Sequence, residues 1–159
     1  MASRAKAYTT TGRKFSLTGK RIGITVAQWH NDITEPLLKG ALAVLKKGGI
    51  KDKDIVITNA PGSFELPLTA QRLIVDDEVD AVLCLGCIIQ GETPHFDYIS
   101  QAVANGIMNV GLAYNIPVIF GVLTTNTLQQ AKERSGGKHG NKGADAATAA
   151  LELLENKKR

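Results

Sequence analysis

The segment at residues 79–98, VDAVLCLGCIIQGETPHFDY, decides the fold class. Its first part, Val79 to Leu85, is an apolar run with the length of a buried strand. Thr93 then provides an N-cap and Pro94 a first helical residue, so a long helix is predicted to about Tyr114. A strand, a short loop and a helix longer than about ten residues form the repeating unit of parallel α/β sheets.

The same alternation continues on both sides of this segment. Further strands are predicted at residues 21–27, 54–60 and 117–123. One helix is predicted from Asp32 or Thr34 to Gly48-Gly49, with Pro36 in its first turn. A second is predicted after Pro61-Gly62, with Pro67 in its first turn. Two more are predicted around residues 131–134 and from about Ala144. We therefore expect an α/β fold with a four-stranded parallel sheet, right-handed crossovers and helices on both faces.

Parallel sheets of this kind bind their ligands outside the carboxyl ends of the strands. This rule brings together five segments: residues 28–30, 61–65 and 86–95, Phe120, and the glycine-rich loop at 134–142.

The charge of the chain is concentrated at its start. Six of the 19 basic residues lie in residues 1–21, which contain no acidic residue, so 13 basic and 15 acidic residues remain in the rest. This distribution favours a solvated or partner-binding tail over a nucleic-acid-binding arm. An organelle transit peptide is a further alternative for this start, although it has no clear amphipathic stripe.

The chain length of 159 residues suits one domain. We expect a single catalytic α/β domain over residues 21–156 and a basic N-terminal tail over residues 1–20. The tail contains no proline and could add an edge strand to a neighbouring subunit. No apolar run approaches the ~18 residues of a membrane helix, and no apolar region of a secretory signal is present. The sequence therefore predicts a cytoplasmic protein that does not bind membranes.

Cys84 and Cys87 form a Cys-x-x-Cys pair that superficially matches a redox or metal site. Residues three apart in a strand point to opposite faces, and a redox pair needs its first thiol at a helix start. The three histidines, His30, His95 and His139, are scattered singly, so the ligand set of a zinc site is missing. A structural role is favoured, and no metal is expected.

Three features could carry chemistry, each with a plainer alternative. Trp29, the only tryptophan, follows a strand and could stack on a flat heteroaromatic ligand or equally pack against a helix. A lone histidine such as His95 is more often structural than catalytic. His95 lies in the first turn of a helix, however, where the dipole favours a neutral imidazole that can accept a proton. Arg134 and Lys142 bracket the glycine-rich loop, which suits a phosphate site and a solvated turn equally well. Glu65 and Glu92 would not be singled out without these neighbours.

Taken together, the motifs resemble the lumazine synthase family. The similarity extends from about Lys20 to Leu154 and includes Pro61-Gly62-Ser63-Phe64-Glu65, Thr93-Pro94-His95-Phe96, the segment PVIFGVLT at 117–124, and Asn141-Lys142-Gly143. It implies a flavodoxin-like three-layer α/β/α sandwich without cofactor or metal. The implied reaction condenses 5-amino-6-(D-ribitylamino)uracil with 3,4-dihydroxy-2-butanone 4-phosphate in riboflavin biosynthesis, giving 6,7-dimethyl-8-ribityllumazine, phosphate and water.

The resemblance also implies a role for each site residue. Trp29 would stack on the pyrimidine, and His95 would move protons between reacting groups. Arg134 would hold the substrate phosphate with the support of Lys142. The other substrate-binding residues would be Ser63, Phe64 and Glu65 around the ribityl chain and ring, Cys87, Ile88 and Ile89 against the ring, Glu92 and Thr93 beside the phosphate substrate, and Phe120 from a neighbouring subunit. The chain departs from the family at Trp29, where Phe is more frequent, and at His30, where Asn is usual.

The resemblance further implies an assembly in which adjacent subunits of a pentamer share each active site. A short turn between the last two helices, as at residues 134–143, is typical of family members whose pentamers form an icosahedral 60-mer. Riboflavin synthase is a candidate protein partner. The main rival interpretation is a non-catalytic flavin or nucleotide-binding protein on the same fold, and a third is an assembly whose main role is a shell.

Overall fold

A computed structural model of the chain describes residues 14–157. The prediction of an added edge strand falls largely on residues 1–13, which lie outside the described part. None of the helices in residues 14–157 is long and apolar enough to cross a membrane.

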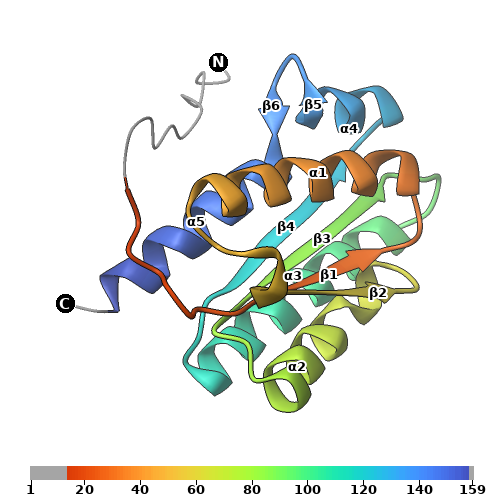
Figure 1. The fold of residues 1–159 in the computed structure, drawn as a ribbon. Coiled ribbons are helices and arrows are strands. Elements are labelled where there is room, and N and C mark those ends of the chain that lie inside the picture. The colour runs from red at the N-terminus through yellow and green to blue at the C-terminus, as the bar shows by residue number, and fades with distance from the viewer. Residues whose placement is uncertain (1–13, 158–159) are drawn as a thin grey trace.

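Four parallel strands form one sheet in the order β2-β1-β3-β4 (Figure 1). The strands are β1 (Ile22–Ala27), β2 (Ile55–Ala60), β3 (Ala81–Ile89) and β4 (Val118–Thr125). The long helices are α1 (Asn31–Lys47), α2 (Leu66–Asp77), α3 (His95–Tyr114) and α5 (Lys142–Asn156), with a short α4 (Leu128–Arg134). Single 3-10 turns, Asp52–Asp54 and Ser63–Glu65, precede β2 and α2.

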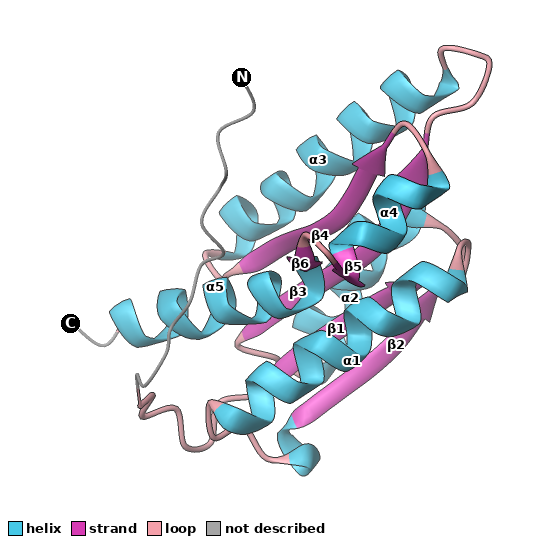
Figure 2. Ribbon diagram, turned by 90° about the horizontal axis from the view of Figure 1, so that it is seen from above, coloured by secondary structure: helices cyan, strands magenta, loops and turns pink. Residues whose placement is uncertain are grey.

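The helices cover both faces of the sheet. In two perpendicular views, α1 and α5 lie together on one face, and α2 and α3 lie on the other (Figures 1 and 2). This arrangement confirms the predicted flavodoxin-like three-layer sandwich with its four-stranded parallel sheet. The chain passes from β1 to β2 on one side and, through β3, to β4 on the other, so the strand order reverses at β1 and β3. Crevices form at such reversal points, beyond the carboxyl ends of the strands.

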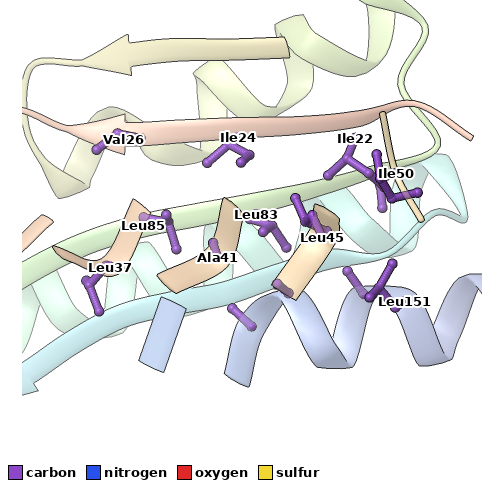
Figure 3. Packing of buried hydrophobic residues seen from close by; sticks show 14 of the residues in the cluster. Ile22, Ile24, Val26, Leu37, Ala41, Leu45, Ile50, Leu83, Leu85 and Leu151 are labelled. Carbon is purple, nitrogen blue, oxygen red and sulfur yellow. The ribbon is translucent and has the colours of Figure 1, made fainter. Parts of the chain in front are cut away.

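The core consists of two apolar layers separated by the sheet. Alternate residues of β1 and β3, including Ile24 and Leu83, point to the α1 and α5 side, where they meet Leu37 and Leu151 (Figure 3). The other layer includes Val82 and residues of α2 and α3. Complete burial of one such aliphatic side chain contributes about 1.5–3 kcal/mol.

Two predicted helix starts were wrong. Helix α1 begins at Asn31, so Asp32 and Thr34 lie in its first turn and Pro36 lies beyond that turn. The Thr34 hydroxyl donates to the Ala27 carbonyl oxygen at 2.9 Å, a tertiary bond that the sequence alone does not reveal.

Helix α3 begins at His95, and its N-cap position is taken by Pro94 without a capping side chain. Thr93 therefore lies one residue too early to be the predicted N-cap. Strand β3 extends beyond the predicted end at Leu85 to Ile89, since it pairs with β4 along that whole length.

The glycine-rich loop forms a small antiparallel hairpin of β5 (Ser135–Gly137) and β6 (Gly140–Asn141). Gly136 and Gly140 adopt positive φ angles of 118° and 82°, which are readily available to glycine. Helix α5 then starts at Lys142, near the predicted start at about Ala144, and Asn141 caps it.

Candidate functional site

A cavity of about 430 Å³ opens where β1, β2 and β3 end. Three loops and the first turns of α3 form its wall, as expected for the point where the strand order reverses. The lining residues are Trp29, His30, Pro61, Gly62, Ser63, Phe64, Glu65, Cys87, Ile88, Ile89, Gly91, Thr93, His95, Phe96 and Ile99. We call this cavity the β1–β3 cleft.

Trp29 and His30 form the connection between β1 and α1. The Gln28 backbone N–H donates to the Ala60 carbonyl oxygen at 2.9 Å, and the Trp29 N–H donates to the Pro61 carbonyl oxygen at 3.3 Å. These bonds continue the pairing of β1 with β2 beyond both strands and fix the backbone of Trp29. Its indole remains 71% exposed and lines the cleft, so a large flat surface is available to a ligand.

His30 turns the chain into α1 with a left-handed backbone, φ 60° and ψ 48°. Histidine is among the residues that tolerate this region better than most. Its carbonyl oxygen accepts from the N–H groups of Ile33 and Thr34 at 2.9 and 3.0 Å, which starts the helix. His30, which stands where the family usually has Asn, also lines the cleft.

The turn after β2 presents polar groups to the cleft. The Gly62 N–H donates to Glu65 Oε2 at 3.0 Å, which folds the turn and orients the carboxylate. The Ser63 side chain is only 7% exposed, and its hydroxyl has no hydrogen-bond partner among the described residues. Gly86 makes room for it, since a Cβ there would lie 2.5 Å from Ser63 Oγ. A buried hydroxyl without a partner is unfavourable, so a hydrogen bond from a ligand or a water molecule would stabilise it.

The two cysteines face opposite sides of the sheet, as predicted. Cys84 belongs to the apolar layer under α2 and α3, whereas Cys87 belongs to the layer under α1 and lines the cleft. Burial raises the pKa of Cys87 to about 12, with a smaller contribution from the negative charge of Asp32. Burial also raises the pKa of Cys84 well above its ordinary range. Both groups are free thiols, and such values are the reverse of those that make a cysteine reactive.

His95 is the first residue of α3, and its exposed imidazole lines the cleft. Phe96 and Ile99 also contribute apolar wall from the first turns of the same helix. Neither was assigned a role from the sequence, although Phe96 belongs to the motif Thr93-Pro94-His95-Phe96. The spacing of four residues from His95 is the signal that could have identified Ile99, because residues four apart share one helix face.

Nine of the thirteen predicted site residues line this cleft, and four do not. The four outside it are Glu92, Phe120, Arg134 and Lys142. Phe120 lies on β4, 42% exposed, in a second groove of about 550 Å³ lined mainly by apolar residues of α3, β4 and α5 and of the α3–β4 connection. Arg134 Nη1 donates to the Gln130 carbonyl oxygen at 3.1 Å, and Lys142 Nζ donates to Asp145 Oδ2 at 2.9 Å.

In residues 14–157, no three His, Cys, Asp or Glu side chains gather closely enough to hold a metal ion. The polar groups around the cleft are instead suited to hydrogen bonding and proton transfer. A stacking surface, a carboxylate, a hydroxyl and an imidazole line it, whereas Arg134 and Lys142, which were predicted to bind phosphate, do not.

Sequence comparison places this chain in a family. The sequence model for 6,7-dimethyl-8-ribityllumazine synthase matches residues 19–158. The protein named 6,7-dimethyl-8-ribityllumazine synthase in Cytophaga hutchinsonii is 57% identical over 139 residues, 87% of each chain. Its namesake in Parabacteroides distasonis is 51% identical over 133 residues, 84% of this chain and 83% of that one. The namesake in Syntrophus aciditrophicus is 46% identical over 147 residues, 92% of this chain and 96% of that one.

Proposed function

We propose a mechanism on the premise that the chain belongs to the 6,7-dimethyl-8-ribityllumazine synthase family. The protein is a transferase that condenses 5-amino-6-(D-ribitylamino)uracil with 3,4-dihydroxy-2-butanone 4-phosphate, releasing phosphate and water. The sequence resemblance predicted this family and reaction, and both are confirmed. The observation that carries the mechanism is the β1–β3 cleft, which gathers a stacking indole, a hydroxyl, a carboxylate and an imidazole.

The pyrimidine substrate would occupy the cleft with its ring against Trp29. An exposed indole at a fixed backbone position offers a large apolar face for a flat heterocycle. The ribityl hydroxyls would then lie beside the turn after β2. There the Glu65 carboxylate would accept hydrogen bonds from them, and Ser63 Oγ would gain the hydrogen-bond partner that it lacks. The carboxyl end of β3, from Cys87 to Ile89, would contact the ring.

The chemistry needs orientation and proton transfer. The substrate amine is itself the nucleophile, so an activated Ser, Cys or Lys is not required. Holding two substrates in contact supplies much of the rate enhancement, and an imidazole that moves protons supplies a further factor of about 10²–10⁴. His95, which is exposed and lines the cleft, is the group that we assign to proton transfer during imine formation, phosphate loss and ring closure.

The phosphate would be bound by Arg134, with Lys142 in support and with Glu92 and Thr93 beside the four-carbon chain. Guanidinium groups bind phosphate through paired, charge-assisted hydrogen bonds. Because Phe120, Arg134 and Lys142 do not line the cleft of their own chain, we assign them to the cleft of an adjacent copy.

Membership of the family supports a homo-oligomer in general. The groove on β4 supports a subunit contact there, since Met108, Leu112 and Leu153 leave its rim exposed and apolar. We assign this contact to a pentamer, and we assign the short hairpin turn to an icosahedral 60-mer of twelve pentamers. Riboflavin synthase as a partner and a cytoplasmic location belong to the same proposal, as do the domain limits 21–156 and the N-terminal tail.

Mixing the purified protein with both substrates tests the reaction directly, because the lumazine product is fluorescent. Product should appear only when both substrates are present. A non-catalytic flavin or nucleotide binder would use the cleft but would have no need of His95, Arg134 and Lys142 together. Saturable binding of the product without any turnover would favour that alternative.

A further inference from the structure

The side chain of Asn141 joins three pieces of backbone. Its Nδ2 donates to the Pro36 carbonyl oxygen of α1 at 2.9 Å. Its Oδ1 accepts from the N–H groups of Gly143 and Ala144 at 2.9 and 3.1 Å. Asn141 is thus the N-cap of α5 and, with the other end of the same amide, a direct link from α5 to α1.

Helix α1 is shaped to receive this amide. Gly40, one turn beyond Pro36, lies directly against it, and a Cβ at Gly40 would come within 2.5 Å of the Asn141 Cγ, Oδ1 and Nδ2 atoms. Any larger residue at Gly40 would therefore displace the Asn141 side chain. This packing and the hydrogen bond to Pro36 together hold the amide against α1.

The linked residue lies between the two proposed phosphate ligands. Asn141 pairs with Ser135 across the hairpin of β5 and β6. Arg134 directly precedes Ser135, and Lys142 directly follows Asn141. The two cations are therefore attached to opposite sides of one paired position in the hairpin, and that position is tied to α1 through Pro36.

We propose that Asn141 is a positioning residue for the phosphate end of the reaction. It contacts no substrate. Instead, it holds the hairpin against α1, so that Arg134 and Lys142 keep a fixed separation and direction toward the phosphate of the adjacent copy's cleft. This inference rests on the proposed function, in which those two cations bind phosphate. Its consequence is selective: the phosphate substrate should be affected, whereas the pyrimidine, held by the β1–β3 cleft, should not.

Two variants disturb the link by different routes. Asn141→Asp keeps the shape and the capping oxygen but replaces the donor to Pro36 with an acceptor. Gly40→Ala adds no charge and keeps the asparagine at position 141, but its methyl group would displace the Asn141 amide from its present place. Ala149→Gly is the matched control, since it weakens α5 through backbone entropy without contacting Asn141.

Steady-state kinetics on the assembled protein give the decisive comparison, with circular dichroism to verify folding. We expect both test variants to raise KM for the phosphate substrate by about 10- to 100-fold, as misplacement of about 1 Å can do. KM for ribitylaminouracil should stay near that of the unaltered protein, and Ala149→Gly should change neither KM. An equal rise of both KM values in the test variants, or the same selective rise in Ala149→Gly, would overturn the proposal.

Calorimetric titration with inorganic phosphate provides a readout that does not depend on turnover. Both test variants should bind phosphate more weakly than the unaltered protein and Ala149→Gly. If the unaltered protein makes no lumazine, the proposed function fails, yet these affinities still test the positioning role. Unchanged phosphate affinity in folded Asn141→Asp and Gly40→Ala proteins would refute it.

Discussion

Gly143 of α5 packs directly against the backbone of Leu37 in α1, and a Cβ at Gly143 would overlap the Leu37 carbonyl oxygen. The same Cβ would lie 2.6 and 2.8 Å from the Leu37 carbonyl carbon and Cα, distances at which backbone must move. The first turn of α5 is therefore held against α1 by backbone contact as well as by the amide of Asn141. Since α1 follows Trp29 and α5 follows the hairpin, this contact joins the two parts of the chain that carry the proposed ligand-binding groups.

Replacement of Gly143 by alanine should destabilise the fold by about 1–3 kcal/mol, the usual range for overpacking of a filled interior. Urea unfolding monitored by circular dichroism measures the change. Gly91→Ala is the matched control, because nothing lies within 4 Å of the added carbon there and φ is not positive. That variant should stay within about 0.5 kcal/mol of the unaltered protein. Equal losses in the two variants would contradict the importance of the contact with Leu37.

Trp29 should report ligand binding directly, since it is the only tryptophan and its exposed indole lines the cleft. Riboflavin or the lumazine product should quench its emission saturably, because a stacked heterocycle lies against the fluorophore. Equilibrium dialysis provides the independent measure of binding. Unchanged emission at ligand concentrations where dialysis detects binding would remove Trp29 from the site.

Loss of the Arg134 side chain should impair turnover more than loss of the His95 side chain. A phosphate deprived of its charge-assisted partner loses about 2–5 kcal/mol of interaction. Water or the substrate phosphate can partly replace a proton shuttle. Steady-state kcat/KM values of Arg134→Ala and His95→Ala decide the order, with Arg134→Lys as a variant that keeps the charge but loses the paired geometry. A milder defect in Arg134→Ala than in His95→Ala would show that the order is wrong.

Strand and helix identity followed from the sequence because strongly apolar runs and long helical segments leave few alternatives. Their ends did not. Pro94 took the N-cap position expected for Thr93, and α1 began at Asn31, before both predicted caps, Asp32 and Thr34. Caps depend on tertiary partners, such as the Pro36 carbonyl oxygen for Asn141, and these partners are distant in the sequence.

Only part of the candidate site could be predicted from the sequence. The ends of parallel strands lie at one edge of a sheet, so the convergence of Trp29, Glu65 and His95 could be predicted from their places after three strands. The unpaired hydroxyl of Ser63 could not, because it depends on the close approach of Gly86 from another strand. Nor does the order of residues reveal that the Asn141 amide reaches α1.

The two cysteines should be unreactive in the folded protein. Because burial raises the pKa of Cys87 to about 12, from an ordinary value of 9.0, its thiol stays protonated at pH 8. The stability that this neutral thiol contributes is complete below pH 9 and declines as the pH rises toward 12. Alkylation with iodoacetamide, followed by mass spectrometry, should modify both Cys84 and Cys87 only after unfolding. Rapid labelling of either in the folded protein at pH 8 would contradict this expectation.

The prediction of a closed shell depends on the hairpin between α4 and α5. Its two strands are joined by Lys138 and His139, and the left-handed glycines Gly136 and Gly140 allow the tight reversal. The backbone N–H of His139 donates to the Glu133 carbonyl oxygen at 2.8 Å, which holds the turn back against α4. Its compact form corresponds to the short turn that the family resemblance associates with closed shells, whereas longer insertions would extend the turn away from α4.

We predict that the protein forms hollow shells of twelve pentamers and that lengthening this turn abolishes them. An insertion of four Gly and Ser residues between Lys138 and His139 should leave pentamers or decamers, because the hairpin would no longer turn back tightly at that point. The same insertion between Lys51 and Asp52, in an exposed turn on the β2 side, is the control and should leave the shells intact. Light scattering and negative-stain microscopy at neutral pH, in phosphate and in phosphate-free buffers, distinguish the particles by size.

Uniform pentamers or decamers of the unaltered protein in all buffers would show that a short turn is not sufficient. Large particles that persist after the Lys138 insertion would show that the turn is not what permits closure.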